Sequence, residues 1–296
     1  MNIKVERIDK MVHRVQVFLD NQPRNHTLKL FFPGDIHHDN PKCVRPKLHE
    51  HLQRAVDEDA LIISIGDQFC LMEGKYDPRR SKEGIRPENN YENYIDRVIK
   101  NFDEDLGKYA KNWAFMGYGN HETNIVSRLH TDPIERLCER WRLKHNSPVV
   151  PGNYQGYILF DIMFPKDTPS KYGTRFRYVV WYHHGGGSSA PVTDGIINMK
   201  RQKVWVEGAD LLINGHKHTA IYKPERIITI NSRGTIQNKK VDLVRIASYK
   251  DEFQPFGWAV EKQFKPSSID SAFIEVDFHR AQKGGIEMNR RVSYWD

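Results

Sequence analysis

Cysteines and long apolar runs are scarce in this chain of 296 residues. It has only three cysteines, Cys43, Cys70 and Cys138, without any CxxC spacing. An odd and sparse set of thiols argues against a disulfide framework and favours a reducing compartment. No stretch approaches the roughly 20 apolar residues that a membrane-spanning helix needs, and the charged N-terminus lacks the apolar core of a secretion signal. We therefore expect a cytoplasmic protein with no membrane association.

The chain also lacks internal repeats, low-complexity linkers and a polybasic tail. Length alone does not decide between one large domain and two ordinary ones. With no linker visible, we expect a single domain over residues 1–296 with a polar insertion loop at about 71–92. Hydrophobic residues at 39% and aromatic residues at 11% suffice for a sizeable core. The net charge of +7 points mildly to anionic partners such as nucleic acid, and an ordinary solvated surface accounts for it equally well.

Apolar runs of strand length alternate with segments of helical periodicity, which is typical of a layered α/β fold. The predicted strands span residues 28–32, 61–65, 113–116, 178–182 and 209–213. The predicted helices span 47–57, 91–109 and 133–141, and the last has Thr131 or Asp132 as its cap. Further along, strands with turn signals are predicted at 227–230, 241–246 and 272–278, and Lys283-Gly284-Gly285 predicts a closing hairpin.

Side chains that bind metal ions follow the predicted strands in one fixed order. The motifs are Asp35-x-His37, Gly66-Asp67, Gly119-Asn120-His121-Glu122, His183, and Gly215-His216-x-His218. Ligand sites of α/β sheets lie just past the carboxyl ends of the strands, so we expect these motifs to meet at one edge. Each motif alone is weak, and an ordinary turn would explain it; their order and placement favour a metal site. Seven ligands with Asp67 shared suffice for two divalent ions, the apparatus for attacking phosphate esters.

With these motifs, from Asp35 to His218 and on into the C-terminal strands, the chain resembles the calcineurin-like metallophosphoesterases. The loop at 182–187 is similar, more weakly, to phage-encoded members. The resemblance implies a four-layer α/β/β/α sandwich with a dinuclear site at one edge. Aspartate, asparagine and histidine donors accept Mn²⁺, which we expect, and also Fe, Zn, Ni or Co. The implied ligands are Asp35, His37 and His218 for the first ion, Asn120, His183 and His216 for the second, and Asp67 as the bridge.

The predicted reaction is hydrolysis of a phosphate ester by a hydroxide that bridges the two ions, with Asp67 and His121 as the catalytic residues. We expect a phosphodiesterase acting on a nucleotide or nucleic acid, a nuclease included. One alternative is a phosphomonoesterase or phosphoprotein phosphatase; these usually carry arginines beside such motifs, whereas the first arginine after the third motif is Arg128. The other is a non-catalytic binding scaffold, which tends to lose ligands, and none is missing here.

Two pairs of neighbouring residues receive separate roles. His121 resembles the family's non-ligand histidine and is expected to act as general acid, or else only to form hydrogen bonds. Glu122 is expected to support the ligands from behind. Of His183 and His184 only one should face the metal, because neighbouring strand residues point in opposite directions. Similarity to the family at the preceding strand favours His183 and leaves His184 as a supporting residue.

A few residues are candidates for contacts with substrate. Arg79, Arg80 and Arg86 lie in the polar insertion and could clamp an anion, with a solvated loop as an equal alternative. Lys217 could contact a substrate phosphate, although an outward lysine is the more frequent outcome. Cys70 stands where many relatives carry an aspartate, and we expect a buried structural thiol there in preference to a soft metal ligand.

Overall fold

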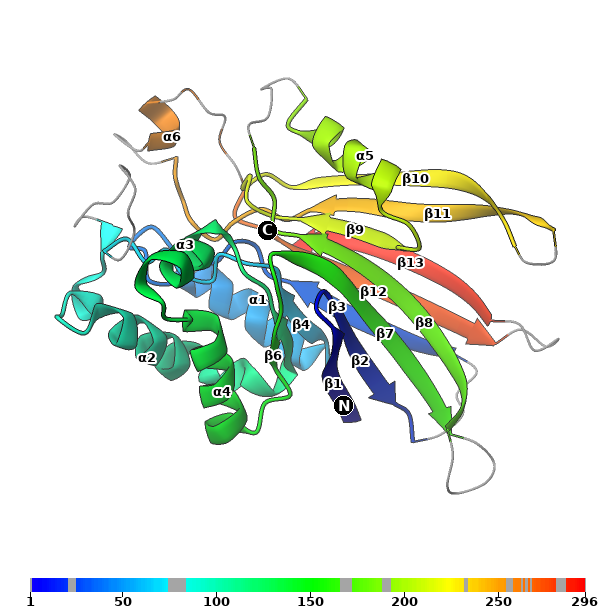
Figure 1. The fold of residues 1–296 in the computed structure, drawn as a ribbon, viewed down its shortest axis with the longest axis horizontal. Coiled ribbons are helices and arrows are strands. Elements are labelled where there is room, and N and C mark those ends of the chain that lie inside the picture. The colour runs from blue at the N-terminus through cyan, green and yellow to red at the C-terminus, as the bar shows by residue number, and fades with distance from the viewer. Residues whose placement is uncertain are drawn as a thin grey trace.

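The computed structural model describes residues 2–20, 25–73, 84–165, 172–187, 193–231, 234–253, 258–261, 263, 266, 268–280 and 286–295. Two mixed β-sheets form its centre (Figure 1). The first has the order β1 (Asn2–Asp9), β2 (Val12–Phe18), β7 (Gln155–Pro165), β8 (Tyr172–His183), β9 (Leu211–Asn214), β11 (Ile236–Arg245), β10 (Ile221–Ile230). The second has the order β13 (Ile286–Trp295), β12 (Ser271–Arg280), β3 (Asn25–Phe32), β4 (Leu61–Ser64), β5 (Trp113–Met116), β6 (Val150–Pro151).

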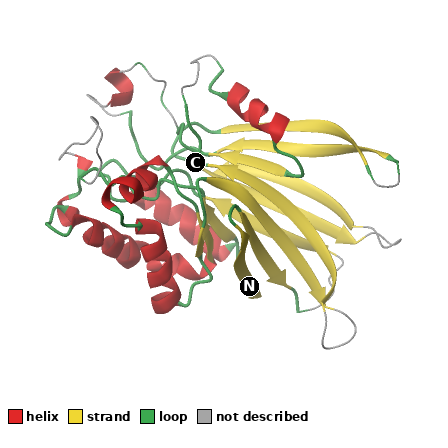
Figure 2. Cartoon of the chain, in the orientation of Figure 1, coloured by secondary structure: helices red, strands yellow, loops and turns green. Residues whose placement is uncertain are grey.

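Helices lie on both outer sides of the sheet pair (Figures 1 and 2). Those on the six-stranded side are α1 (Arg45–Asp57), α2 (Tyr94–Leu106), α3 (Asn120–Leu129) and α4 (Pro133–His145), with the 3₁₀ turns η2 (Pro87–Asn89) and η3 (Gly107–Asn112). Helix α5 (Ile196–Trp205) covers part of the seven-stranded sheet, and α6 (Trp258–Glu261) is a single turn. The layers are therefore α/β/β/α, which confirms the expected fold class.

Alternating side chains on the strands build three hydrophobic clusters that hold these layers together. On β3, Leu28, Leu30 and Phe32 face the space between the sheets, whereas Phe31 packs under the helices. On β8 and β9, Trp181 and Leu212 face α5, and their neighbours face the other sheet. This period of two is the geometry of a strand buried on both faces.

Most elements predicted from apolar periodicity are confirmed. The helix predicted at 47–57 is α1, and the one at 91–109 is α2 followed by η3. The Asp132 carboxylate accepts hydrogen bonds from the backbone N–H groups of Ile134 and Glu135, which makes it the cap of α4. Strands β12 and β13 pair antiparallel as a closing hairpin, while its turn lies outside the described residues.

Several elements were not predicted from the sequence, among them the strands β1, β2 and β7 and the helices α3 and α5. Polar residues alternate with apolar ones along β1 and β2, so they carry no continuous apolar run. Helix α3 starts at Asn120 itself, within a motif for which no helix was predicted. Much of the expected insertion loop, residues 74–83, lies outside the described part, and the single-domain organisation stays a prediction. Within the described residues, no helix has the length and apolar character that crossing a membrane requires.

Candidate metal centre

The predicted ligands come together because the strands that carry them run in parallel. Strands β3, β4 and β5 pair in parallel within one sheet, and β8 and β9 pair in parallel within the other. Their carboxyl ends therefore open at a common edge, where a ligand site is expected. Backbone contacts join the loops that follow these strands. Asp35 forms an isolated β-bridge with Ser248, and the Gly215 N–H donates a hydrogen bond to the His184 carbonyl.

One group of ligand atoms consists of Asp35, His37 and His218, which lie within 4.8 Å of one another. His218 Nε2 lies 3.4 Å from Asp35 Oδ2 and 3.4 Å from His37 Nε2. Asp35 is fully buried, and its Oδ1 has no hydrogen-bond partner within the described structure. A buried carboxylate oxygen without a partner is costly, and a cation would satisfy it.

A second group consists of Asp67, His184 and His216, again within 4.8 Å of one another. His184 Nε2 lies 3.2 Å from Asp67 Oδ2 and 3.3 Å from Asn120 Oδ1. The same Asp67 Oδ2 lies 3.8 Å from His37 Nε2 of the first group. One carboxylate oxygen thus stands between the two groups, as the predicted bridging role requires.

The backbone at the site is strained. Four of the candidate ligands, His37, Asp67, His216 and His218, have φ between 47° and 70°, the left-handed region that residues with a Cβ rarely adopt. Glycines make the close approaches possible: a Cβ on Gly119 would lie 2.0 Å from Asp67 Oδ1, and one on Gly215 would lie 2.6 Å from Asp35 Oδ1. Strain of this kind persists only where surrounding structure enforces it, and it clusters at functional sites.

Charge is balanced inside the site by the histidines. Burial works to lower the pKa of His184, but the Asp67 and Asp35 carboxylates outweigh it and raise that pKa to about 9. Burial likewise opposes protonation of His218, whereas hydrogen bonds to Asp35 and Glu252 raise its pKa to about 9. In His216, burial and nearby positive charge lower the pKa to about 4. Imidazolium groups thus neutralise the carboxylates, and a metal ion taking their place would release protons.

The structure places His184, and not His183, in the second group of possible ligands. His184 is fully buried and lies in the second group, whereas His183 is half-buried, accepts a hydrogen bond from the Gly185 N–H and packs edge-on against Tyr154. The reason is the alternation of β8: Tyr182 faces the other sheet, where Asp67 and Asn120 lie, and His184 continues that face. His183 continues the face of Trp181, away from the site.

His121, the expected general acid, lies beside both groups. Its backbone N–H donates to Asp67 Oδ1 at 3.2 Å, and its ring lies 4.8 Å from the ring of His37. Its Nδ1 lies 2.6 Å from the Cys70 carbonyl oxygen and donates a hydrogen bond to it. This bond fixes the ring orientation and leaves Nε2 as the atom that can exchange a proton. With 8% of its surface exposed, His121 is also within reach of solvent.

Glu122 supports the site from behind through the backbone. Its carboxylate accepts hydrogen bonds from the N–H groups of Asp67, Phe69 and Gly119. It thereby joins the loop after β4 to the start of α3, which carries Asn120 and His121. Burial and the charge of Asp67 raise the pKa of Glu122 to about 8.

The residues predicted to contact substrate do not gather at the site as the candidate ligands do. Arg79 and Arg80 lie outside the described residues. The Arg86 side chain donates to the carbonyls of Asn40 and Cys43, so it braces a loop. Lys217 Nζ donates to the Gly187 carbonyl and is half-buried, which differs from the solvated outward lysine.

Sequence reasoning missed Glu252 and Lys250. Glu252 Oε2 lies 3.1 Å from His218 Nδ1, and Lys250 Nζ lies 2.6 Å from Glu252 Oε1. A carboxylate that holds the far nitrogen of a ligand histidine fixes the orientation of its ring. The sequence gives no signal for this pair, because it stands in an irregular segment past β11.

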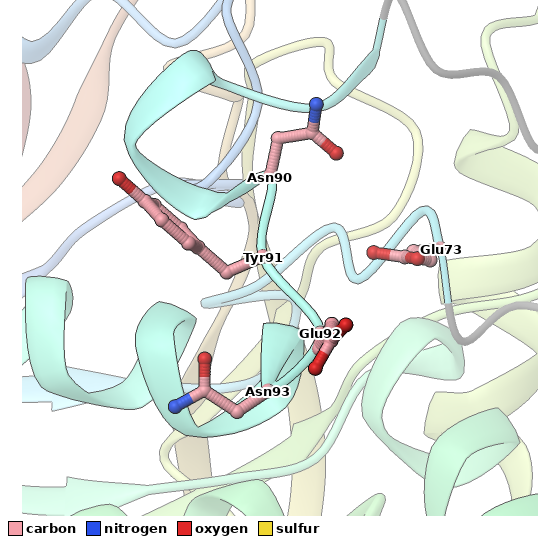
Figure 3. Close-up of a pocket in the computed structure, with 5 residues that line it drawn as sticks. All are labelled: Glu73, Asn90, Tyr91, Glu92 and Asn93. Atoms are coloured by element: carbon pink, nitrogen blue, oxygen red, sulfur yellow. The ribbon is translucent and has the colours of Figure 1, made fainter.

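A separate hollow is lined by Glu73, Asn90, Tyr91, Glu92 and Asn93 (Figure 3). Glu73 comes from a different segment and lies across from the backbone of residues 90–93. None of the predicted ligands lines it, and its two carboxylates make it a poor place for an anionic substrate.

Comparisons with known proteins found likeness only among solved structures. No protein-family profile and no curated protein matches the chain. Vps29 from Chaetomium thermophilum is 9% identical, with a TM-score of 0.34 over 90% of this chain and 96% of its own. A hypothetical protein from Thermus thermophilus is 11% identical, with a TM-score of 0.32 over 90% of this chain and 99% of its own. GAP50, the anchor in the inner membrane complex of Plasmodium, is 12% identical, with a TM-score of 0.39 over 89% of this chain and 88% of its own. Likeness at this level carries no functional argument, so function is argued from this chain's own residues.

Proposed function

We propose that the chain is a dinuclear metal-dependent phosphoesterase that hydrolyses a phosphodiester of a nucleotide or nucleic acid. The observation that carries the proposal is the position of Asp67 Oδ2, 3.2 Å from His184 Nε2 and 3.8 Å from His37 Nε2. A single oxygen within reach of both ligand groups is what a bridging carboxylate requires. The motifs also resemble those of the calcineurin-like metallophosphoesterases.

The donor set fits two divalent cations. Asp35, His37 and His218 would hold one, and Asn120, His184 and His216 the other, with Asp67 between them. When bound, such ions make hydroxide available near neutral pH and neutralise charge on a phosphate ester. Mixed carboxylate, amide and imidazole donors suit Mn²⁺, which we favour, and also accept Fe, Zn, Ni or Co.

His121 is the proposed general acid. Its Nδ1 is held by the Cys70 carbonyl, so Nε2 carries the proton that a leaving alkoxide would take. Asp67 positions this residue as well, because its Oδ1 accepts the His121 backbone N–H. Glu122 keeps the two loops in register, and Glu252 orients His218.

The charge around the ligands favours a diester substrate over a monoester. A phosphomonoester carries about two negative charges and is usually gripped by arginines. In the described part of the structure, Arg86 is engaged by backbone carbonyls, and Lys250 is paired with Glu252. Lys217, the cation within the ligand motifs, donates to one carbonyl, that of Gly187, and has two further N–H donors for the single charge of a diester. We also propose a cytoplasmic location, which the three buried cysteine thiols support.

The test is hydrolysis of bis-p-nitrophenyl phosphate and p-nitrophenyl phosphate by metal-free protein supplied with Mn²⁺. We expect Mn²⁺-dependent turnover with the diester as the better substrate. His184→Ala should remove it, and His183→Ala, the matched neighbour outside the ligand groups, should retain most of it. A faster monoester reaction would favour the phosphomonoesterase or phosphoprotein phosphatase alternative. The absence of turnover with any divalent ion would favour the alternative of a non-catalytic binding scaffold.

A further inference from the structure

Cys70 forms a third group of possible ligands with His37 and His121, separate in membership from the two Asp/His groups. The three side chains each present one ligand atom, and these atoms lie within 4.8 Å of one another. His37 and Cys70 are fully buried, and His121 forms the partly exposed edge of the group. Two imidazoles and a thiol at this spacing can satisfy three of the four positions of a tetrahedral ion.

The orientation of His121 is that of a metal ligand. Its Nδ1–H donates to the Cys70 carbonyl oxygen at 2.6 Å, so in the neutral ring the lone pair is on Nε2. Histidines that bind metals typically hold their other nitrogen in this way, with a backbone carbonyl or a carboxylate. His37 has an unpartnered nitrogen as well, since its Nδ1 has no hydrogen-bond partner within the described structure.

A hydrogen-bond donor and a charged group lie near the Cys70 thiol, which binds a metal ion as the thiolate. Asn40 Nδ2 donates a hydrogen bond to Cys70 Sγ at 3.3 Å. The half-buried Lys250, whose Nζ lies 2.6 Å from Glu252 Oε1, interacts electrostatically with Cys70: burial acts to lower the pKa of Lys250, whereas Cys70 and Glu252 raise it. A hydrogen-bond donor and a cation both stabilise negative charge on sulfur.

We infer that Cys70, His37 and His121 form a site for a thiophilic divalent ion, Zn²⁺ or Cd²⁺, whose binding inhibits the phosphoesterase. Binding forms a sulfur–metal bond, the thiol proton goes to solvent, and nothing is oxidised or reduced. Thiolate ligands select such ions over Mn²⁺, which prefers oxygen donors. Inhibition follows because the ion occupies His121 and competes for His37. The inhibitory part rests on the proposed function, and the binding part does not.

The binding part is tested by adding Cd²⁺ to the metal-free protein and recording thiolate-to-metal charge transfer in the ultraviolet. We expect a band that saturates at one thiolate per chain and disappears in Cys70→Ser and Cys70→Ala. Cys138→Ser, which replaces another buried thiol in α4, is the matched control and should keep the band. X-ray absorption of the Zn²⁺-loaded protein should show one sulfur ligand with nitrogen neighbours. A wild-type protein without a band, or an unchanged band in folded Cys70→Ser, overturns the site.

The inhibitory part is tested with Zn²⁺ added at fixed Mn²⁺ during diester hydrolysis. With inhibition measured relative to each protein's own turnover without Zn²⁺, Cys70→Ser should need on the order of tenfold or more Zn²⁺ for half inhibition, the scale expected when a ligand is lost. Equal inhibition of wild type and Cys70→Ser would contradict inhibition through this site. If no diester is hydrolysed under any condition while the Cd²⁺ band appears, the proposed function fails and the thiolate site stands.

Discussion

The Nε2 atoms of His37 and His218 lie 3.4 Å apart, although 181 positions separate the two residues in the chain. Two ring N–H groups cannot face each other at that distance, so one proton is shared or a cation lies between the rings. Asp35 Oδ2, 3.4 Å from the same His218 atom, adds a negative donor to the pair. A protonated His218 meets part of this need, and a divalent cation in place of its proton would coordinate all three atoms.

Metal binding should therefore stabilise the fold. With Mn²⁺ at about 100 times its dissociation constant, linkage adds about 2.7 kcal/mol to the free energy of unfolding. We expect the melting temperature to rise with Mn²⁺ and to fall on chelation, and His218→Ala to reduce that response. His279→Ala, on the exposed side of β12, is the control and should respond like the wild type. An equal response of the His218 and His279 variants would count against His218 as a ligand.

Removing the proposed general acid should slow the reaction without removing metal. His121→Gln should lower kcat by about 10²–10⁴-fold, the usual contribution of a positioned acid. The loss should be smaller for a p-nitrophenyl ester than for an alkyl ester, because nitrophenolate leaves without a proton. The measurement is kcat of the wild type and of His121→Gln on both esters, and the metal content of each protein is determined as a control. The same loss for both esters would indicate a role other than proton donation.

Glu122 should matter for stability because three backbone N–H groups depend on it. Glu122→Ala leaves those buried donors without their acceptor, and we expect a loss of about 3 kcal/mol in the free energy of unfolding. Glu122→Gln keeps one acceptor oxygen and should lose less. Urea unfolding measures both, with the exposed Glu135→Gln as control. Identical stability of Glu122→Ala and wild type would show that the loops are held by other contacts.

A pH-dependent loss of stability is expected from His13, which is buried against Phe115. Burial and the charge of Arg7 lower the pKa of His13 from 6.5 to about 4. Between these two pH values the unfolded chain binds a proton at His13 that the folded chain does not. The contribution of neutral His13 to the free energy of unfolding is therefore complete above pH 6.5 and is lost as the pH falls toward 4. The difference of 2.5 in pKa corresponds to about 3 kcal/mol. His13→Leu should flatten the profile of unfolding free energy in this window, and parallel profiles would contradict the assignment.

The positions of the candidate ligands were predictable because the chemistry of a strand end is encoded locally. A short apolar run followed by Asp67 or His216 marks both the strand and its functional end. The preference for His183 came from similarity to the family, whereas counting along the strand favours His184. Tyr178, Val180 and Tyr182 face the other sheet, and the same alternation selects His184.

Other parts of the site were not predictable because they depend on tertiary contacts. Glu252 reaches His218 from an irregular segment that carries no periodic signal. Cys70 meets His121 because Glu122 draws together the loop after β4 and the start of α3. The β1–β2 hairpin is half polar along its length, so only its pairing with β7 shows that it completes the sheet.

The central claim is that Asp67 bridges two cations, and metal content after equilibrium dialysis against Mn²⁺ tests it most directly. The account predicts two ions per chain for the wild type, and a loss of binding at both positions in Asp67→Asn. Asp277→Asn, a half-buried carboxylate on β12, should still bind two. A wild-type content of one ion or none, or two ions in Asp67→Asn, would contradict it.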